Sequence, residues 1–296
     1  MEQSKINAIL DSRLIIATNS KLYNIKLVDC GSYKQIYYYK KAKVKRLNKE
    51  DNADLDLSKI RLNANIVLEK KEEKLKTKNE IQERNLIRSK LQCQRIAKAN
   101  MEDWKSFITL TFEENITEVK KAWKKLHSFI TIVQRNFPNF KYLCVPEFQK
   151  RGAVHYHLLT NIPCDSEMVP KRQLKRLYNP NIKDYKELEY YDIKYWNNGF
   201  SSAEPLENDA KKVVGYISKY MTKDIDNRLF NHRRYFYSRN VKIPKVSYID
   251  TGNNKDYEYL IKKIQDKELI YQNEYINSYD NSQVSFLEYQ WQLNYT

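Results

Sequence analysis

The sequence predicts an α+β fold in which an antiparallel sheet is backed by helices. A run rich in β-branched and aromatic residues at 107–112 reads as a strand, and a helical pattern follows at 117–136. Two more strand-like runs, 140–148 and 153–160, surround a short turn, and a second helical pattern covers 208–224. This order of strand, helix, strand, strand and helix is typical of an antiparallel sheet covered by helices.

Charge and composition divide the 296-residue chain into three parts. Residues 1–100 carry 23 Lys and Arg against 12 Asp and Glu, and they are predicted to form a basic DNA-binding or clamping extension. Within this extension we expect strand structure at 22–47 and one long surface helix at 66–100. Residues 101–249 hold the alternating pattern and form the expected core domain. Residues 250–296 are expected to be a polar, Tyr-rich tail that is helical or frayed.

The overall composition limits the function classes. A net charge of +16 and a pI of about 9.4 fit a polyanionic partner. The sequence has no run of 18 apolar residues and no secretion signal at its start, so we expect a cytoplasmic protein without membrane association. None of the five glycines lies in a phosphate-binding GxxxxGK[ST] or GxGxxG pattern, so no nucleotide cofactor is expected. The four scattered cysteines favour neither a zinc knuckle nor a disulfide framework.

A basic strand-like segment lies at Tyr33–Lys49, with seven basic residues and no acidic one. Its lysines, among them Lys40, Lys41 and Lys43, would follow a phosphate backbone, while the rings of Tyr37–Tyr39 would stack on bases. The same lysines would also suit an exposed strand that must avoid pairing at its edge. The sequence leaves both interpretations open.

Two histidines on one strand and a glutamate on the preceding strand are candidate metal ligands. Side chains alternate along a strand, so His155 and His157 share one face of the sheet. If Phe148 pairs with Val154, Glu147 lies opposite His155 and all three donors converge, whereas a shift of one residue turns Glu147 away. We predict the converging register, which corresponds to a turn with an odd number of residues.

This donor set leaves coordination positions for water or a phosphate oxygen, as catalysis requires. Hard oxygen ligands suit Mg²⁺ or Mn²⁺, and the imidazoles favour Mn²⁺. Non-haem iron oxygenases use the same donors, but nothing in the sequence indicates their barrel. Structural zinc would need a fourth ligand, which His127 and His232 are poorly placed to supply. In the remaining alternative, the histidines of the pair only form hydrogen bonds on a half-buried sheet.

The helical pattern at 209–224 has a buried side and a tyrosine–lysine side. Its apolar stripe consists of Ala210, Val213, Val214, Ile217 and Met221. Tyr216, Lys219 and Lys223 cluster about a third of a turn away, with Tyr220 between the two sides. Because a phenol with an ordinary pKa near 10 is a poor nucleophile, neighbouring ammonium groups would favour the phenolate and stabilise charge on a phosphate. The alternative is a surface tyrosine on a DNA-binding helix.

Three segments carry a resemblance to a known family. They are a threonine-containing apolar strand, a histidine strand preceded by a glutamate, and a tyrosine–lysine helix, at Phe107–Phe112, Arg151–His157 with Glu147, and Tyr216–Lys223. Trp196–Gly199 and Ser238–Arg239 are similar to weaker features of the same family. In order, spacing and chemistry these segments resemble the HUH endonuclease superfamily of rolling-circle replication initiators, especially those of small phages and related plasmids. The resemblance covers residues 100–245, about half of the chain.

The resemblance implies a nuclease core with a ferredoxin-like or RRM-like antiparallel sheet. It also implies that Glu147, His155 and His157 hold a metal that polarises the scissile phosphate, which Tyr216 attacks. The products would be a 5′-phosphotyrosine link and a free 3′-OH, and the reaction would reverse to rejoin strands. Lys219 would assist this chemistry, and Tyr220 is either a second nucleophile or a packing residue.

The expected partners are single-stranded or origin DNA and, in a bacterial host cell, a helicase and a DNA polymerase. Candidate DNA contacts are Thr109, Thr111, Arg151, Lys223, Arg233, Arg234, Arg239, Lys40, Lys41 and Lys43. A conjugative relaxase or single-strand transposase would use the same chemistry on other DNA. A basic DNA- or RNA-binding regulator would keep the fold without the chemistry.

Overall fold

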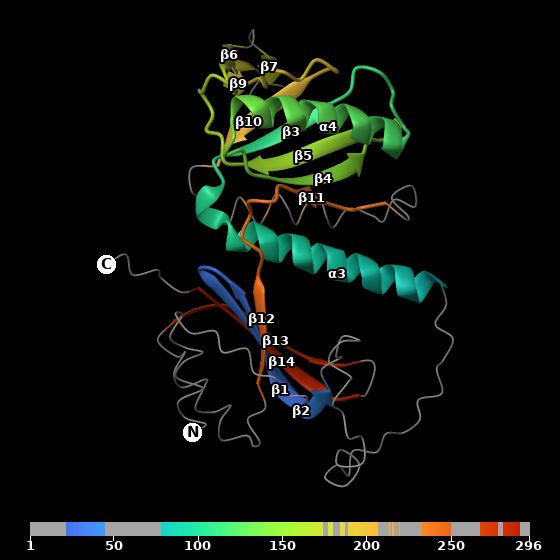
Figure 1. Ribbon diagram of the computed structural model, residues 1–296, viewed down its shortest axis with the longest axis vertical. Coiled ribbons are helices and arrows are strands. Elements are labelled where there is room, and N and C mark those ends of the chain that lie inside the picture. Colours follow the sequence, from blue (N-terminus) through green and yellow to red (C-terminus); the bar gives the residue numbers. More distant parts are fainter. Residues whose placement is uncertain are drawn as a thin grey trace. The chain divides into compact units, whose positions relative to one another are not determined.

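The protein divides into two compact units, which are described separately. The computed structural model describes residues 22–44, 78–173, 177–179, 184–186, 189–206, 213, 215, 219, 232–249, 267–277 and 281–290. One unit combines both ends of the chain, Met1–Glu83 and Pro244–Thr296, and the other is Arg84–Ile243. We call them the terminal unit and the central unit (Figure 1).

The central unit is built on a seven-stranded antiparallel sheet. Its strand order is β11-β4-β5-β3-β10-β9-β6. The bounds in chain order are β3 Ser106–Thr111, β4 Tyr142–Phe148, β5 Val154–Thr160, β6 Lys171–Gln173, β9 Glu189–Tyr191, β10 Ser201–Pro205 and β11 Phe236–Tyr237. A separate two-stranded sheet pairs β7 (Leu177–Asn179) with β8 (Asp184–Lys186). The helices are α3 (Lys78–Ala99), the short 3₁₀ helix η2 (Met101–Asp103) and α4 (Val119–Asn136).

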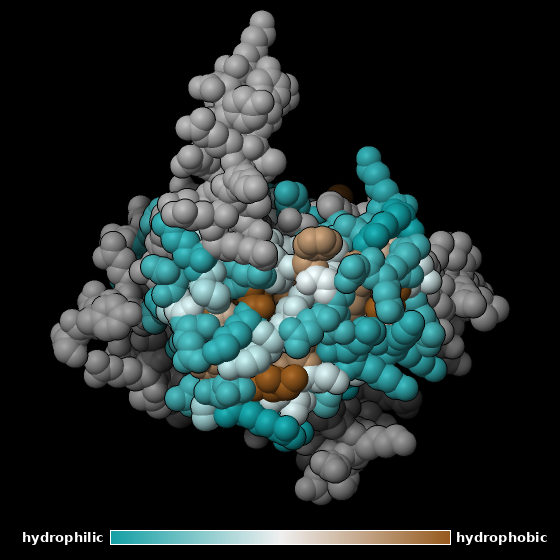
Figure 2. Space-filling model, turned by 90° about the horizontal axis from the view of Figure 1, so that it is seen from above, coloured by the Kyte–Doolittle hydropathy of each residue, from teal (hydrophilic) through white to brown (hydrophobic). Residues whose placement is uncertain are grey.

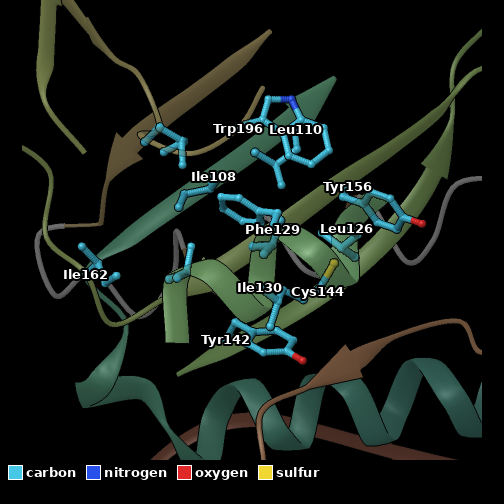
Figure 3. Packing of buried hydrophobic residues seen from close by; sticks show 14 of the residues in the cluster. Ile108, Leu110, Leu126, Phe129, Ile130, Tyr142, Cys144, Tyr156, Ile162 and Trp196 are labelled. Carbon is cyan, nitrogen blue, oxygen red and sulfur yellow. The ribbon is translucent and has the colours of Figure 1, made fainter. Parts of the chain in front are cut away.

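Helix α4 covers one face of this sheet (Figures 1 and 3). Its buried residues, spaced three and four apart, are Ala122, Leu126, Phe129, Ile130 and Val133. They pack against every second residue of β3, β4 and β5, namely Ile108, Leu110, Tyr142, Cys144, Val154, Tyr156 and Leu158. This all-apolar layer is the larger of the two cores in the central unit.

The opposite face of the sheet carries a second core at one end only. Phe107, Leu143, Val145 and Leu159 point to this side, and α3 supplies Cys93, Ile96 and Ala97. Trp104 is fully buried in this cluster, and its indole Nε1 donates to the carbonyl of Ala97 at 2.9 Å. The other end of the same face carries polar side chains, which form the candidate site described below.

The Trp196–Gly199 segment holds the end of β3 in place. The indole of Trp196 is buried against Phe112 and donates from Nε1 to the carbonyl of Thr111 at 3.1 Å. Gly199 has a φ of +143°, and a Cβ at this position would stand 2.3 Å from the backbone nitrogen of Glu113. Only glycine fits both the conformation and the space.

The terminal unit is built on a five-stranded antiparallel sheet. Its strand order is β12-β1-β2-β14-β13. The bounds are β1 Leu22–Cys30, β2 Tyr33–Val44, β12 Lys245–Ile249, β13 Glu268–Ile276 and β14 Gln283–Gln290. Segments from the two ends of the sequence therefore meet in one sheet, because β2 pairs with both β1 and β14.

Three expectations for this unit were wrong. Strand β2 is not an edge strand, since it has a neighbour on each side. Tyr37 and Tyr38 are buried, so their rings are not available for stacking on bases. The segment expected to be helical or frayed contains the strands β13 and β14. Consecutive buried side chains on β2 show that both faces of this strand are covered, which its lysine-rich pattern did not indicate.

The predicted α+β class is confirmed, and the expected central strands and helix appear within a few residues of their predicted bounds. No helix in the described part of the chain is long and apolar enough to cross a membrane. The face of the molecule in Figure 2 is mostly hydrophilic, with small separate hydrophobic areas.

Candidate metal and nucleophile site

The polar end of the sheet face brings together side chains from three adjacent strands. Strands β4 and β5 pair so that Glu147 lies opposite His155 and Phe148 opposite Val154, which is the predicted register. On the other side of β5, Thr111 lies opposite His155 and Thr109 opposite His157. Residues paired across antiparallel strands point to the same face. The carboxylate, the two imidazoles and the two hydroxyls therefore share one surface.

His157 is held on all sides. The carboxylate Oε2 of Glu147 accepts a hydrogen bond from its Nε2 at 2.7 Å, and Thr109 Oγ1 lies 3.1 Å from its Nδ1. The ring of Phe107 stacks on the imidazole with centroids 5.7 Å apart and planes 6° from parallel. The His157 side chain is 5% exposed. Both ring nitrogens thus have a defined partner, which fixes the ring orientation.

His155 lies next to this pair and nearer the β4–β5 turn. Its ring centroid is 6.3 Å from that of His157, and its side chain is partly exposed although its Nε2 atom is buried. Glu147 lies between the two histidines along the sheet, being bonded to one and paired in register with the other. The surface therefore offers one carboxylate oxygen pair and two imidazole nitrogens within two neighbouring strands.

This donor set suits a divalent ion by its chemistry, since one carboxylate and two imidazoles leave room for oxygen ligands. In the described part of the chain, however, no three His, Cys, Asp or Glu side chains stand close enough to hold an ion as they are placed. The direct bond between Glu147 and His157 accounts for this, because it occupies atoms that an ion would need. Coordination requires these two side chains to exchange their mutual bond for the ion.

The β4–β5 turn is closed by its own hydrogen bonds and tied to the end of β3. The amide of Gln149 donates to the carbonyl of Ala153 at 2.9 Å, which makes a five-residue turn, Gln149–Ala153. Gly152 has a φ of +89° in this turn. The guanidinium of Arg151 donates to Gln149 Oε1 at 2.8 Å and to the carbonyl of Phe112 at 2.9 Å. Arg151, a predicted DNA contact, therefore braces the turn that positions Glu147 and His155.

The helix predicted to carry the nucleophile is described at only three positions. Val213, Gly215 and Lys219 are helical; Val213 is 1% exposed, and Lys219 is exposed. Val213 belongs to the apolar cluster on the face that carries His157, together with Phe107 and Val145. Tyr216, Tyr220 and Lys223 lie outside the described residues. The helix thus packs on the imidazole side of the sheet and not on the α4 side.

Described tyrosines near the histidines are unsuited to attack a phosphate. Tyr156 lies between His155 and His157 in sequence but points into the α4 core, where burial raises the pKa of its phenol. Tyr142 points to the same core, and burial raises its pKa to about 12. Tyr235 packs on the imidazole side, where burial also raises its pKa to about 12. A raised pKa disfavours the phenolate that would be the nucleophile.

The remaining predicted DNA contacts lie in two places. Arg233 and Arg239 are exposed in the central unit, and Arg234 is partly exposed, with a buried Nη1 atom that has no hydrogen-bond partner among the described residues. Lys40 and Lys41 are exposed on β2 of the terminal unit. Lys43 on the same strand donates from Nζ to Ser282 Oγ at 2.8 Å.

Comparison with known proteins places this site within a replication-associated region. Residues 105–225 match the family model of replication-associated proteins of the ORF2 type. The "Phasyl DNA replicon protein arp" of Escherichia coli is 26% identical to the chain over 130 residues. Both matches support a replication initiator. No solved structure matches the chain significantly.

The similarity to the replicon protein is partial. The alignment covers 41% of this chain and 44% of the relative, so it spans under half of either protein. The family match runs from the residue before β3 to the predicted nucleophile helix, and it includes Glu147, His155 and His157. The terminal unit lies outside this match.

Two contacts at this site were not predicted. Phe107 and Thr109 were recognised only as strand and DNA-contact residues, yet one stacks on His157 and the other bonds it. The signal lies in the pairing of β3 with β5, which places alternate residues of the two strands on one face. Local sequence does not determine which two strands pair.

Proposed function

We propose that the chain initiates rolling-circle replication by nicking one DNA strand with Tyr216 and later rejoining strands. The proposal makes the chain an HUH endonuclease that acts on single-stranded or origin DNA. The free 3′-OH would serve a bacterial host polymerase, with a host helicase opening the duplex. The similarity of residues 105–225 to replication-associated proteins supports the initiator role.

The observation that carries the proposal is the shared face of the sheet. Glu147, His155 and His157 point to the same side as the cluster that buries Val213. Tyr216 comes three residues after Val213 in the predicted helix, about one turn along it. A phenol on the α4 side would have been separated from the imidazoles by the sheet.

The reaction is a transesterification at the scissile phosphate. The phenol oxygen of Tyr216 forms a bond to phosphorus, the bond from phosphorus to the 3′-oxygen breaks, and the phenol proton passes to that oxygen. Exposed Lys219, one turn from Tyr216, stabilises the phenolate and the charge that develops on the phosphate. Because the phosphoester is exchanged and not hydrolysed, a 3′-OH can attack the phosphotyrosine and restore the strand.

Glu147, His155 and His157 would hold a divalent ion, Mg²⁺ or Mn²⁺. When bound there, the ion would polarise the scissile phosphate. Thr109 orients His157 through Nδ1 and leaves Nε2 for coordination. The turn bonds of Arg151 keep Glu147 in register with His155.

A covalent adduct tests the proposal. The full chain is incubated with Mn²⁺ and labelled single-stranded fragments that tile the DNA encoding it, and adducts stable in denaturant are counted. We expect an adduct with the wild type and none with Tyr216→Phe. Tyr156→Phe, which removes a hydroxyl from the opposite face, is the matched control and should retain the adduct.

Further outcomes separate the alternatives. An undiminished adduct in Tyr216→Phe contradicts the assigned nucleophile. DNA binding without any adduct across the tiled fragments favours a non-catalytic regulator. Cleavage confined to transfer-origin or transposon-end sequences favours a relaxase or a transposase. Loss of rejoining but not of nicking in Tyr220→Phe would make Tyr220 the second nucleophile.

A further inference from the structure

Strand β13 differs from the other long strands in the described part of the chain by its exposure. All nine residues of Glu268–Ile276 are exposed. They include five large apolar side chains that are 42% to 69% exposed, namely Leu269, Ile270, Tyr271, Tyr275 and Ile276. Its neighbour β14 buries Val284, Leu287 and Tyr289. Exposed apolar side chains grouped on one strand indicate an interaction surface.

The two edges of the terminal sheet are built differently. Strand β12 is five residues long, begins at Lys245 and directly follows Pro244, and both residue types discourage pairing at an edge. Strand β13 is nine residues long and contains no Lys, Arg, Pro or Gly. Among the described residues it pairs only with β14. One edge is protected against a further strand and the other is not.

The charge of β13 favours a protein partner over DNA. The strand carries two glutamates, Glu268 and Glu274, and no basic residue, so a phosphate backbone is repelled. The chain as a whole has a net charge of +16. Two copies would therefore approach with the least repulsion through their acidic segments.

We propose that β13 pairs antiparallel with β13 of a second copy of this chain, which joins the two terminal sheets into one. A two-fold axis through the pair brings residues on the same face together, so the axis must pass through a residue. The pairing of β13 with β14 shifts between Leu269 and Tyr271, which limits the regular ladder to Tyr271–Ile276. The axis therefore lies at Asn273 or Glu274.

Side-chain complementarity selects Asn273. An axis at Glu274 would set the two Glu274 carboxylates against each other, which is destabilising. An axis at Asn273 places Tyr271 opposite Tyr275 of the second copy and Gln272 opposite Glu274 of the second copy. The first pair stacks aromatic rings, and in the second an amide can donate to a carboxylate.

The pairing is expected to be weak. Two short strands joined at an edge bury less than the roughly 1,200–2,000 Å² of a stable interface. We expect a dissociation constant of about micromolar, or about −8 kcal/mol at the 1 M standard state. Sedimentation velocity of the full chain over a concentration series measures it.

A substitution at the axis tests the register. Asn273→Lys would set two ammonium groups opposite each other, and we expect dimer dissociation to increase at least tenfold. Val246→Lys, at an exposed position on the protected edge β12, introduces the same charge and should leave association unchanged. A dimer that Asn273→Lys does not weaken, or one that both variants weaken equally, overturns the proposal.

A cross-link provides a second measurement. Paired Cα atoms across antiparallel strands stand about 4.5–5.5 Å apart, which a disulfide can span. Asn273→Cys should therefore form an intermolecular disulfide under mild oxidation, whereas Glu268→Cys, five residues from the axis, should not. A chain that is monomeric at every concentration, with the β13 amides protected from hydrogen exchange, would show that β13 is covered within its own molecule and would refute the proposal.

Discussion

The two faces of the central sheet come from the same three strands but serve different purposes. Toward α4, alternate residues of β3, β4 and β5 are apolar and buried. On the opposite face the intervening residues change along the strands, from Phe107, Leu143 and Leu159 at one end to Glu147 and His155 at the other. The two-residue period of a strand therefore separates the layer that stabilises the fold from the one that carries chemistry. Substitutions on the two faces should affect different measurements.

The largest effect on stability is expected on the α4 face. Phe129 is 2% exposed, and its ring meets Trp196 edge to face at 5.5 Å. Phe129→Ala should lower the free energy of unfolding by about 3–5 kcal/mol, since it leaves a cavity. Chemical denaturation measures this loss. Mn²⁺ affinity of the folded fraction should stay near that of the wild type.

The control is Ile132→Ala on the same helix, because Ile132 is 38% exposed. It should change stability by less than about 0.5 kcal/mol. If Phe129→Ala abolished Mn²⁺ binding while the chain remained folded, the two faces would not be separable in this way.

Gly199 connects the two faces by fixing the end of β3, and its substitution should have the next largest effect. A Cβ would stand 2.5 Å from the carbonyl oxygen of Thr111, and the φ of +143° suits only glycine. Strain and overlap each cost about 1–3 kcal/mol, so we expect Gly199→Ala to lose about 3 kcal/mol after relaxation. The melting temperature should fall accordingly.

Gly215 is the matched control for this substitution, since a Cβ there meets nothing within 4 Å. Gly215→Ala in a helix should stabilise the protein slightly, by about 0.5–1 kcal/mol. Equal melting temperatures for the two variants would contradict the close approach of Gly199 to β3.

A smaller effect is expected at Thr109, and it should appear in metal binding more than in stability. When His157 Nε2 binds an ion, Nδ1 carries the proton and must donate to Thr109 Oγ1, which now lies 3.1 Å away. Thr109→Val cannot accept this bond and should weaken Mn²⁺ binding about 10–100-fold. Calorimetric titration without DNA measures the affinity.

Thr109→Ser keeps the hydroxyl and should restore most of the affinity. If the valine and serine variants bound Mn²⁺ equally well, Thr109 would have no positioning role and its value would lie in packing or DNA contact.

The sequence predicted what depends on local pattern and missed what depends on distant pairing. The register of Glu147 with His155 followed from strand alternation and the turn, and it is confirmed. The contact of Thr109 with His157 was missed because it needs the pairing of β3 with β5, 48 residues apart at this point. The positions of Tyr216 and Tyr220 remain predictions, because both lie outside the described residues.

The terminal sheet was missed for the same physical reason. Strand β2 pairs with β14, so residue Ile36 lies opposite Leu287, and no local period reports so distant a partner. The lysines of β2 suggested a solvated edge, whereas the strand lies inside the sheet. The polar residues of the segment after 250 hid the alternation of β14, whose Val284, Leu287 and Tyr289 are buried.

The smallest effect, at Arg151, decides which role this residue has at the boundary between the two faces. Its guanidinium bonds Gln149 and the carbonyl of Phe112 across the β4–β5 turn, at 2.8 and 2.9 Å. Arg151→Ala should therefore lower stability by about 1 kcal/mol through loss of these bonds. A phosphate contact would instead appear as a fall of about one in the slope of log affinity for DNA against log salt concentration. Because the bonds of Arg151 are directed at the turn, we expect the slope to change by less than half a unit. Lys150→Ala removes the same charge from an exposed position on the same turn and controls for the general field. A slope that falls by one for Arg151→Ala, but not for Lys150→Ala, would make Arg151 a direct DNA contact and place the path of the strand beside Glu147 and His155.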